Sequence, residues 1–167
     1  FSYKGAKSSI DYNGDGDARN DLIFVFNDES TVNMVDSDGN NAWNAWTAFV
    51  NQDDALKEYK GKIIDRNAAR QPWRNRLDLR ITQKILGRIE LTLDIINFAN
   101  LLSSDMGQQE YVPYGTVDLL YFEDFEDEND VSSKPTFTFD TEKYTKTEDV
   151  YSVSDFGSRW QMLLGLR

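Results

Sequence analysis

The amino-acid sequence predicts a mainly β fold with antiparallel strands, one helix and two long loops. Residues 74–84 and 88–98 each alternate apolar and polar side chains, and a very short turn joins them. Residues 158–167 alternate in the same way. Alternation with a period of two indicates strands, whereas apolar residues three and four apart, as found near 42–60, indicate a helix.

The first long stretch, residues 6–72, is predicted to be a loop that carries this helix. Its early part is rich in Gly, Asp, Asn and Ser, which favour turns. Within 42–60, Trp43, Trp46 and Phe49 are spaced so that they share one face of a helix. These aromatic residues are therefore expected to pack against a sheet.

The two alternating runs are expected to pair antiparallel around Leu86–Gly87, because a short turn containing glycine joins matched patterns. Leu79 and Leu93 should then share a face, since a slip of one residue would reverse every side chain. Residues 103–157, between the hairpin and the last strand, are predicted to be a long acidic loop that contains a short strand at 135–139.

The composition excludes several classes of function. The net charge of −11 and the pI near 4.4 argue against binding to nucleic-acid phosphates. The chain has no cysteine and no histidine, so thiolate sites and the commonest general base are absent. No stretch reaches the roughly 18 apolar residues of a membrane-spanning helix. We therefore expect no enzymatic activity, and only metal sites built from oxygen ligands are plausible.

The alternating runs leave two interpretations open. A half-buried sheet in a soluble protein produces this pattern, and so does the wall of an outer-membrane barrel. Each run has about the 9 to 11 residues with which a tilted strand crosses a bilayer. Barrels of that kind have short turns at one rim and long loops at the other, which matches the lengths predicted here.

Three segments and the last ten residues resemble one family. The segments are DYNGDGDARNDLIFVF, AFVNQDDALKEYKGKIIDRNAARQPWRNRLDLRI and LTLDIINFANLLSSDMG, and the chain closes with SRWQMLLGLR. Together they resemble the C-terminal end of TonB-dependent outer-membrane receptors, of the Bacteroidetes type with a carboxypeptidase-regulatory-like N-terminal domain. The resemblance covers residues 1 to about 102 and 157–167. The chain departs from the family by closing on Leu166–Arg167 instead of an aromatic residue.

The resemblance implies that the chain is the last part of a β-barrel of about 22 strands around a plug. Residues 74–98 and 158–167 would be barrel wall, and 6–72 and 103–157 would be extracellular loops. The side chains expected to face lipid are Leu77, Leu79, Ile81, Leu91, Leu93, Trp160, Met162 and Leu164. Those expected to face the lumen are Arg76, Asp78, Arg80, Glu90, Asp94 and Arg159.

The resemblance also implies partners and a location. The chain would contact outer-membrane lipid and the rest of the receptor barrel and plug, and it would engage TonB only through the plug region, which these residues lack. The whole receptor would take up nutrients across the outer membrane of a Gram-negative cell. This part alone would not transport, and self-association through its open strand edges is a further expectation.

A calcium loop is the one metal site that the sequence suggests. Asp11, Asn13 and Asp15 have the one-three-five spacing of calcium ligands, and Asp17 and Asp21 could complete the shell. Position twelve of the loop is not the usual Glu, and a turn held by Asx hydrogen bonds is the alternative. If Ca²⁺ binds, we expect the weak affinity of extracellular modules, about 10⁻⁴ to 10⁻³ M.

Two other interpretations compete with the receptor. Asp78 and Asp94 lie on adjacent predicted strands, but with 29 acidic residues a chance pair is expected and nearby arginines offer charge partners. No catalytic residue is therefore assigned. A secreted, calcium-dependent β-rich domain that binds carbohydrate is the alternative from another class.

If these strands are part of a barrel wall, their apolar face would be exposed to water outside the barrel and something else must cover it. We expect the helix that carries Trp43, Trp46 and Phe49 to fold over the hairpin and to be the main cover. The alternative is that a second copy packs on it.

Overall fold

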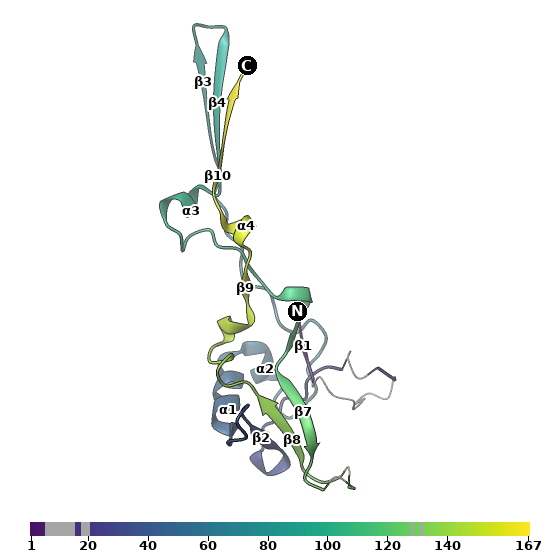
Figure 1. Cartoon of the computed structure of the whole chain (residues 1–167). Helices are drawn as coiled ribbons and strands as arrows, with labels where there is room; N and C mark the ends of the chain where they lie inside the picture. Colours follow the sequence, from purple (N-terminus) through teal and green to yellow (C-terminus); the bar gives the residue numbers. More distant parts are fainter. Residues whose placement is uncertain (6–15, 18–20, 128, 131) are drawn as a thin grey trace. The chain divides into compact units, whose positions relative to one another are not determined.

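The computed structural model describes residues 1–5, 16–17, 21–127, 129–130 and 132–167, and they form two units. Unit 1 contains residues 1–70 and 112–151, and unit 2 contains residues 71–111 and 152–167. Each unit is therefore assembled from two separate parts of the chain. Figure 1 traces the chain through both units.

Unit 1 is built on strands that are distant in sequence. β2 (Asn33–Val35) pairs in parallel with β8 (Pro135–Phe139), and β8 pairs antiparallel with β7 (Leu120–Phe125). β1 (Ser2–Lys4) pairs in parallel with β6 (Thr116–Asp118). The segments expected to be two separate loops thus fold together into one unit.

The predicted helix near 42–60 is two helices, α1 (Trp43–Gln52) and α2 (Asp54–Glu58), so the expectation of one continuous helix is wrong. The break lies at Asp53, which has an extended backbone and accepts a hydrogen bond from the Leu56 amide through Oδ1 (2.9 Å). Aspartate side chains favour this capping role over a helix interior, because they compete for backbone amides.

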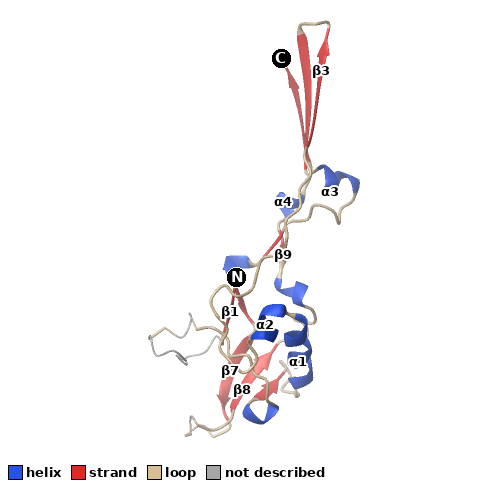
Figure 2. Ribbon diagram, turned by 180° about the vertical axis from the view of Figure 1, so that it is seen from behind, coloured by secondary structure: helices blue, strands red, loops and turns tan. Residues whose placement is uncertain are grey.

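The core of unit 1 lies between α1 and the strands (Figure 2). Trp46 is fully buried, its indole Nε1 donates to the Phe26 carbonyl (3.0 Å), and its ring packs edge-on against Phe139 with centroids 5.6 Å apart. Phe49, one turn further on, also contacts Phe139 (5.7 Å). The aromatic spacing thus predicted a packing face correctly.

That face covers a different sheet from the one expected. Trp46 and Phe49 pack on β8 inside unit 1, whereas the hairpin belongs to unit 2 and keeps many apolar side chains exposed. The prediction that α1 is the main cover of the hairpin is therefore wrong. The reason is that Phe139, from the short strand expected at 135–139, and Tyr144, from the loop expected after it, supply the apolar partners that the helix needs.

Unit 2 contains the predicted hairpin. β3 (Leu79–Ile85) and β4 (Ile89–Ile96) pair antiparallel, with Ile81 opposite Leu93. Leu79 and Leu93 share one face, as predicted. Leu86 (φ 54°) and Gly87 (φ 69°) form the turn, and two positive φ angles fit the twist of a tight hairpin. β10 (Gln161–Leu166) adds a third strand to the other edge of β4.

The remaining elements of the chain are short. In unit 2, α3 (Phe98–Leu102) follows β4, α4 (Asp155–Ser158) precedes β10, and β5 (Glu110–Tyr111) pairs with β9 (Ser152–Val153). The described residues of unit 1 include 3₁₀ turns at Glu29–Thr31, Pro113–Gly115 and Thr147–Val150.

Residues 103–157 contain β5 to β9, and β8 has the bounds of the short strand expected at 135–139. The other four strands were not predicted, so the segment is not the long loop that was expected. The acidic run begins inside β7, where Glu123 accepts a hydrogen bond from the Thr138 hydroxyl (2.7 Å). Acidic residues disfavour strands, but pairing with β8 overrides that preference here.

The fold class is mixed, with 32% strand and 22% helix. The sheets in the described parts are small and open, and the strands of unit 2 are antiparallel as expected. Among the described residues, no helix has the length and apolar character to cross a membrane.

Candidate functional site

The sheet of β10, β4 and β3 has one apolar face. The register places Leu164 opposite Leu93 and Leu93 opposite Ile81, so apolar side chains run across all three strands. The face consists of Leu79, Ile81, Ile85, Ile89, Leu91, Leu93, Ile95, Met162, Leu164 and Leu166, with Gln83 as the exception. On the outer strands most of these side chains are exposed, and Leu164 is 73% accessible.

The opposite face of the same sheet is mostly polar. Arg80 lies directly opposite Asp94 and holds it through two hydrogen bonds, one of them from Nη2 to Oδ2 (2.8 Å). Thr82 pairs with Thr92, and Lys84 with Glu90, along the same two strands. On β10 this face carries Leu163 and Gly165.

Asn97 joins the three strands at the end of the sheet away from the turn. Its backbone amide donates to Asp78 Oδ1 (2.9 Å), and its buried Nδ2 donates to the carbonyls of Gly107 (2.9 Å) and Ser158 (2.7 Å). Asn97 has a positive φ (54°), which asparagine tolerates better than most residues. These bonds tie the approach to β3, the end of β4 and the approach to β10 together.

The carboxylates that suggested a catalytic pair are both engaged with arginine. Asp78 lies 2.9 Å from Arg76 and also accepts from Asn97, and Asp94 is held by Arg80. Arg159, expected in the lumen, pairs with Asp155, the first residue of α4 (2.6 Å). The geometry accordingly gives both aspartates structural partners.

Most of the predicted calcium loop lies outside the described residues. Asp11, Asn13 and Asp15 are among the residues that are not described. Asp17 is partly exposed, and Asp21 is buried, with its backbone carbonyl accepting from the Gly5 amide (3.0 Å). Across the described ranges, no three acidic side chains gather in a way that could hold a metal ion. The calcium prediction therefore stays a prediction.

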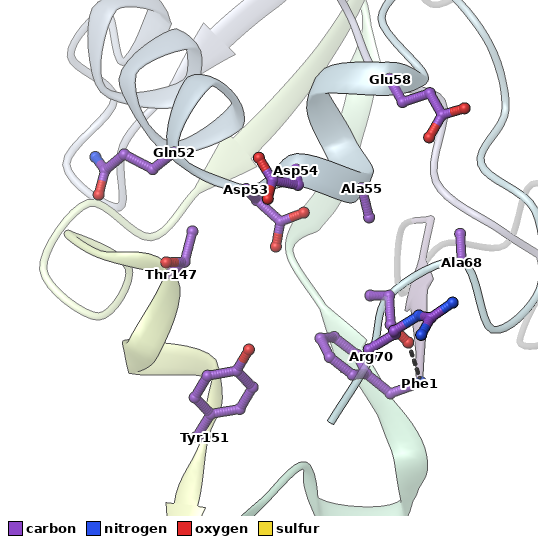
Figure 3. Close-up of a pocket in the computed structure, with 11 residues that line it drawn as sticks. Phe1, Gln52, Asp53, Asp54, Ala55, Glu58, Ala68, Arg70, Thr147 and Tyr151 are labelled. Carbon is purple, nitrogen blue, oxygen red and sulfur yellow. Dashed lines mark hydrogen bonds between the residues drawn. The ribbon is translucent and has the colours of Figure 1, made fainter. Parts of the chain in front are cut away.

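A polar pocket of about 460 Å³ lies in unit 1 beside the start of α2. Asp53 points into it, with Thr147 and Tyr151 on one side and Phe1 and Arg70 on the other (Figure 3). The Phe1 nitrogen donates to the Ala69 carbonyl (2.6 Å), which fixes that wall. Sequence reasoning missed this pocket, because its walls come from four segments, at residue 1, 52–58, 68–70 and 147–151, that no local pattern brings together.

Both carboxylate oxygens of Asp53 accept hydrogen bonds that stabilise the fold of unit 1. One carboxylate oxygen caps α2, and the other accepts a hydrogen bond from the Tyr3 hydroxyl (2.5 Å). Burial, followed by the charge of Asp53, raises the pKa of the Tyr3 phenol far above its usual value. The neutral phenol is thereby held as a donor inside unit 1.

This arrangement predicts a loss of stability in alkali. Below about pH 10 the Tyr3 phenol is protonated in both the folded and the unfolded chain. Above it, only the unfolded chain releases the proton, so the free energy of unfolding falls as the pH rises. For the Tyr3→Phe variant, the free energy of unfolding should fall less steeply between pH 10 and 11.5. Urea unfolding at each pH measures it. Tyr114→Phe, at a fully exposed position, should follow the wild type, and parallel curves for all three would refute the prediction.

No protein-family model, curated protein or solved structure matches this chain. A functional proposal therefore has to explain the two-faced sheet and the Asn97 clasp, by which we mean the hydrogen bonds from Asn97 to Asp78, Gly107 and Ser158.

Proposed function

We propose that this chain is the C-terminal wall segment of a TonB-dependent outer-membrane receptor, together with the extracellular unit that its long connections build. The apolar face of the β10–β4–β3 sheet supports this proposal most directly. A soluble protein gains about 1.5 to 3 kcal/mol for each large apolar side chain that it buries, so a whole face left exposed is costly. A lipid-facing wall removes that cost.

The polar face fits the other side of such a wall. Strands of these barrels alternate apolar side chains toward lipid with polar side chains toward the interior. The paired charges of Arg80 and Asp94 would lie in the lumen, where each satisfies the other. Leu77, Trp160 and Met162 would belong to the lipid side and Glu90 to the lumen side, as the resemblance implies.

The connections support the same assignment. β3 and β4 are joined by a three-residue turn at 86–88, whereas residues 97–160 leave and return at the opposite end of the sheet. A hydrogen bond from the Phe98 amide to the Leu77 carbonyl extends the pairing to Leu77–Ile85. That run is nine residues (77 to 85), which is at the short end of a membrane strand.

The open edges of the sheet also fit a wall segment. β4 is central, and β3 and β10 each use one edge for pairing with it. In the receptor the outer edges would pair with neighbouring barrel strands, since a membrane wall has to satisfy its backbone groups by closure. The plug, and TonB through it, would engage the barrel from regions outside these residues.

The proposal predicts vesicle binding that depends on one face of β10. Leu163 and Leu164 are adjacent, are 52% and 73% exposed, and lie on opposite faces of the sheet. Leu164→Arg should weaken partitioning into neutral phosphatidylcholine vesicles about tenfold or more, because arginine is costly on a lipid-facing surface. Leu163→Arg should have little effect. Co-flotation of the purified chain with vesicles measures both.

Two outcomes of this experiment would overturn the proposal. One is that the wild-type chain does not float with vesicles at all. The other is that both arginine variants lose binding equally, which would mean that the two faces are not distinguished by lipid. Circular dichroism of each variant confirms that the sheet is retained.

A further inference from the structure

A second pocket of about 460 Å³ lies in unit 1, on the opposite side of the 21–26 segment from the core. Ile23 and Val25 of this segment are buried in the core, and the alternate residues Leu22, Phe24 and Phe26 line the pocket. Sequence alternation therefore presents one row of side chains to each side.

Aromatic rings form the wall of this pocket. Phe24 contacts Phe26 (5.0 Å between ring centroids), and Phe26 contacts Phe137 of β8 (5.2 Å). Phe122 contacts both Phe137 (5.5 Å) and Phe125 (5.1 Å). The five rings thus form one continuous surface, with Ile63 beside it at 51% exposure.

Rings in such contact normally close a core completely, because voids forfeit packing energy. Among the described residues, the wall stays open around a space within the range of small-molecule sites, about 300 to 1,000 Å³. The volume of this space fits a small molecule.

The lining also defines the chemistry of a ligand. No ionisable side chain is among the described residues that line the pocket, so a charged group inside it would have no partner. The polar side chains of the lining are Asn27 and Thr31. The Thr31 hydroxyl already donates to the Asp28 carbonyl (2.8 Å), and the exposed Asn27 amide makes no hydrogen bond to any described residue.

We propose that this pocket binds a small, uncharged aromatic molecule. The ring of the ligand stacks edge-on or offset against the phenylalanine wall, and a single polar substituent bonds to the Asn27 amide. All walls of the pocket belong to unit 1, so the proposal does not depend on the membrane assignment of the unit 2 sheet.

The test uses N-phenyl-1-naphthylamine, an uncharged aromatic dye whose fluorescence rises in apolar surroundings. The wild-type chain should bind it saturably. Ile63→Glu should weaken binding about tenfold or more, because the new carboxylate would be desolvated beside the dye. The matched control is Ile81→Glu, which makes the same change at an equally exposed position (50%) on the apolar face of unit 2. It should leave the saturable binding unchanged.

Nuclear Overhauser contacts between the dye and the rings of Phe24 and Phe122 give a second measurement that does not depend on a variant. Contacts to these rings would support the pocket. The proposal is overturned if binding is lost in Ile81→Glu and kept in Ile63→Glu, since the dye would then occupy the sheet face. It is equally overturned if the dye shows no saturable binding, or if its contacts fall on β3 and β10.

Discussion

Replacing Trp46 with alanine is expected to destabilise the chain by about 3 to 5 kcal/mol, the usual cost of removing a buried tryptophan. The indole is fully buried between α1 and β8, and it bonds to the Phe26 carbonyl. Alanine would leave a large cavity against Phe139 and remove the hydrogen bond that Trp46 donates to this carbonyl. Urea unfolding followed by circular dichroism measures the difference in free energy.

Trp73→Ala is the matched control for this prediction. Trp73 is almost completely exposed, so the same deletion should change stability by no more than about 0.5 kcal/mol. A loss below about 1 kcal/mol for Trp46→Ala would mean that α1 is not anchored on β8 as described.

Gly107→Ala should be the most damaging small substitution in unit 2. Gly107 has a φ of 68°, where an L side chain is strained by about 1 to 2 kcal/mol. A Cβ there would lie 2.1 Å from Asn97 Oδ1, so the clasp would have to open. We expect a total loss of about 3 kcal/mol or more, because the Asn97 amide would also leave buried carbonyls unpaired. Amide exchange of β4 and β10 measures the loss.

Gly87→Ala is the control that distinguishes the backbone strain of a positive φ from the steric clash with Asn97. Gly87 has nearly the same φ (69°), but a Cβ there meets no atom within 4 Å. It should therefore cost only the backbone strain. If Gly107→Ala and Gly87→Ala reduce the protection of the β4 and β10 amides against exchange equally, the Asn97 clasp does not hold the strands together. Adding Asn97→Ala to Gly107→Ala should reduce the extra penalty, since the clash is with the amide itself.

The hairpin was predictable from sequence because all the information for it is local. Alternation fixed the two faces of β3 and β4, and the Leu86–Gly87 turn fixed the register between them. The same patterns identified which residues share the apolar face and which share the face of Arg80 and Asp94.

Unit 1 was not predictable in the same way. Its parallel pairings, β1 with β6 and β2 with β8, join segments about 100 residues apart, and no local pattern specifies such partners. The break of the helix at Asp53 could have been read from the capping preference of aspartate, but good helix formers on both sides concealed it.

The functional features divide along the same line. The two-faced sheet follows from alternation, whereas the phenylalanine pocket requires the 21–26 segment to meet β7 and β8. The Asn97 clasp likewise depends on Gly107 and Ser158 reaching one side chain from different directions. No local sequence pattern identified the pocket phenylalanines or the residues of the Asn97 clasp as functional.

The discontinuity of unit 1 sets an order of events during synthesis. The hairpin can form as soon as residue 96 is available, because its contacts are local and such contacts form quickly. Within residues 1–70, Trp46 and Phe49 must wait for β8 before they can pack on Phe139. A nascent chain therefore carries Trp46 and Phe49 without their β8 partner while nearly 70 further residues are made, and during that period these two aromatic side chains would be a binding site for a chaperone.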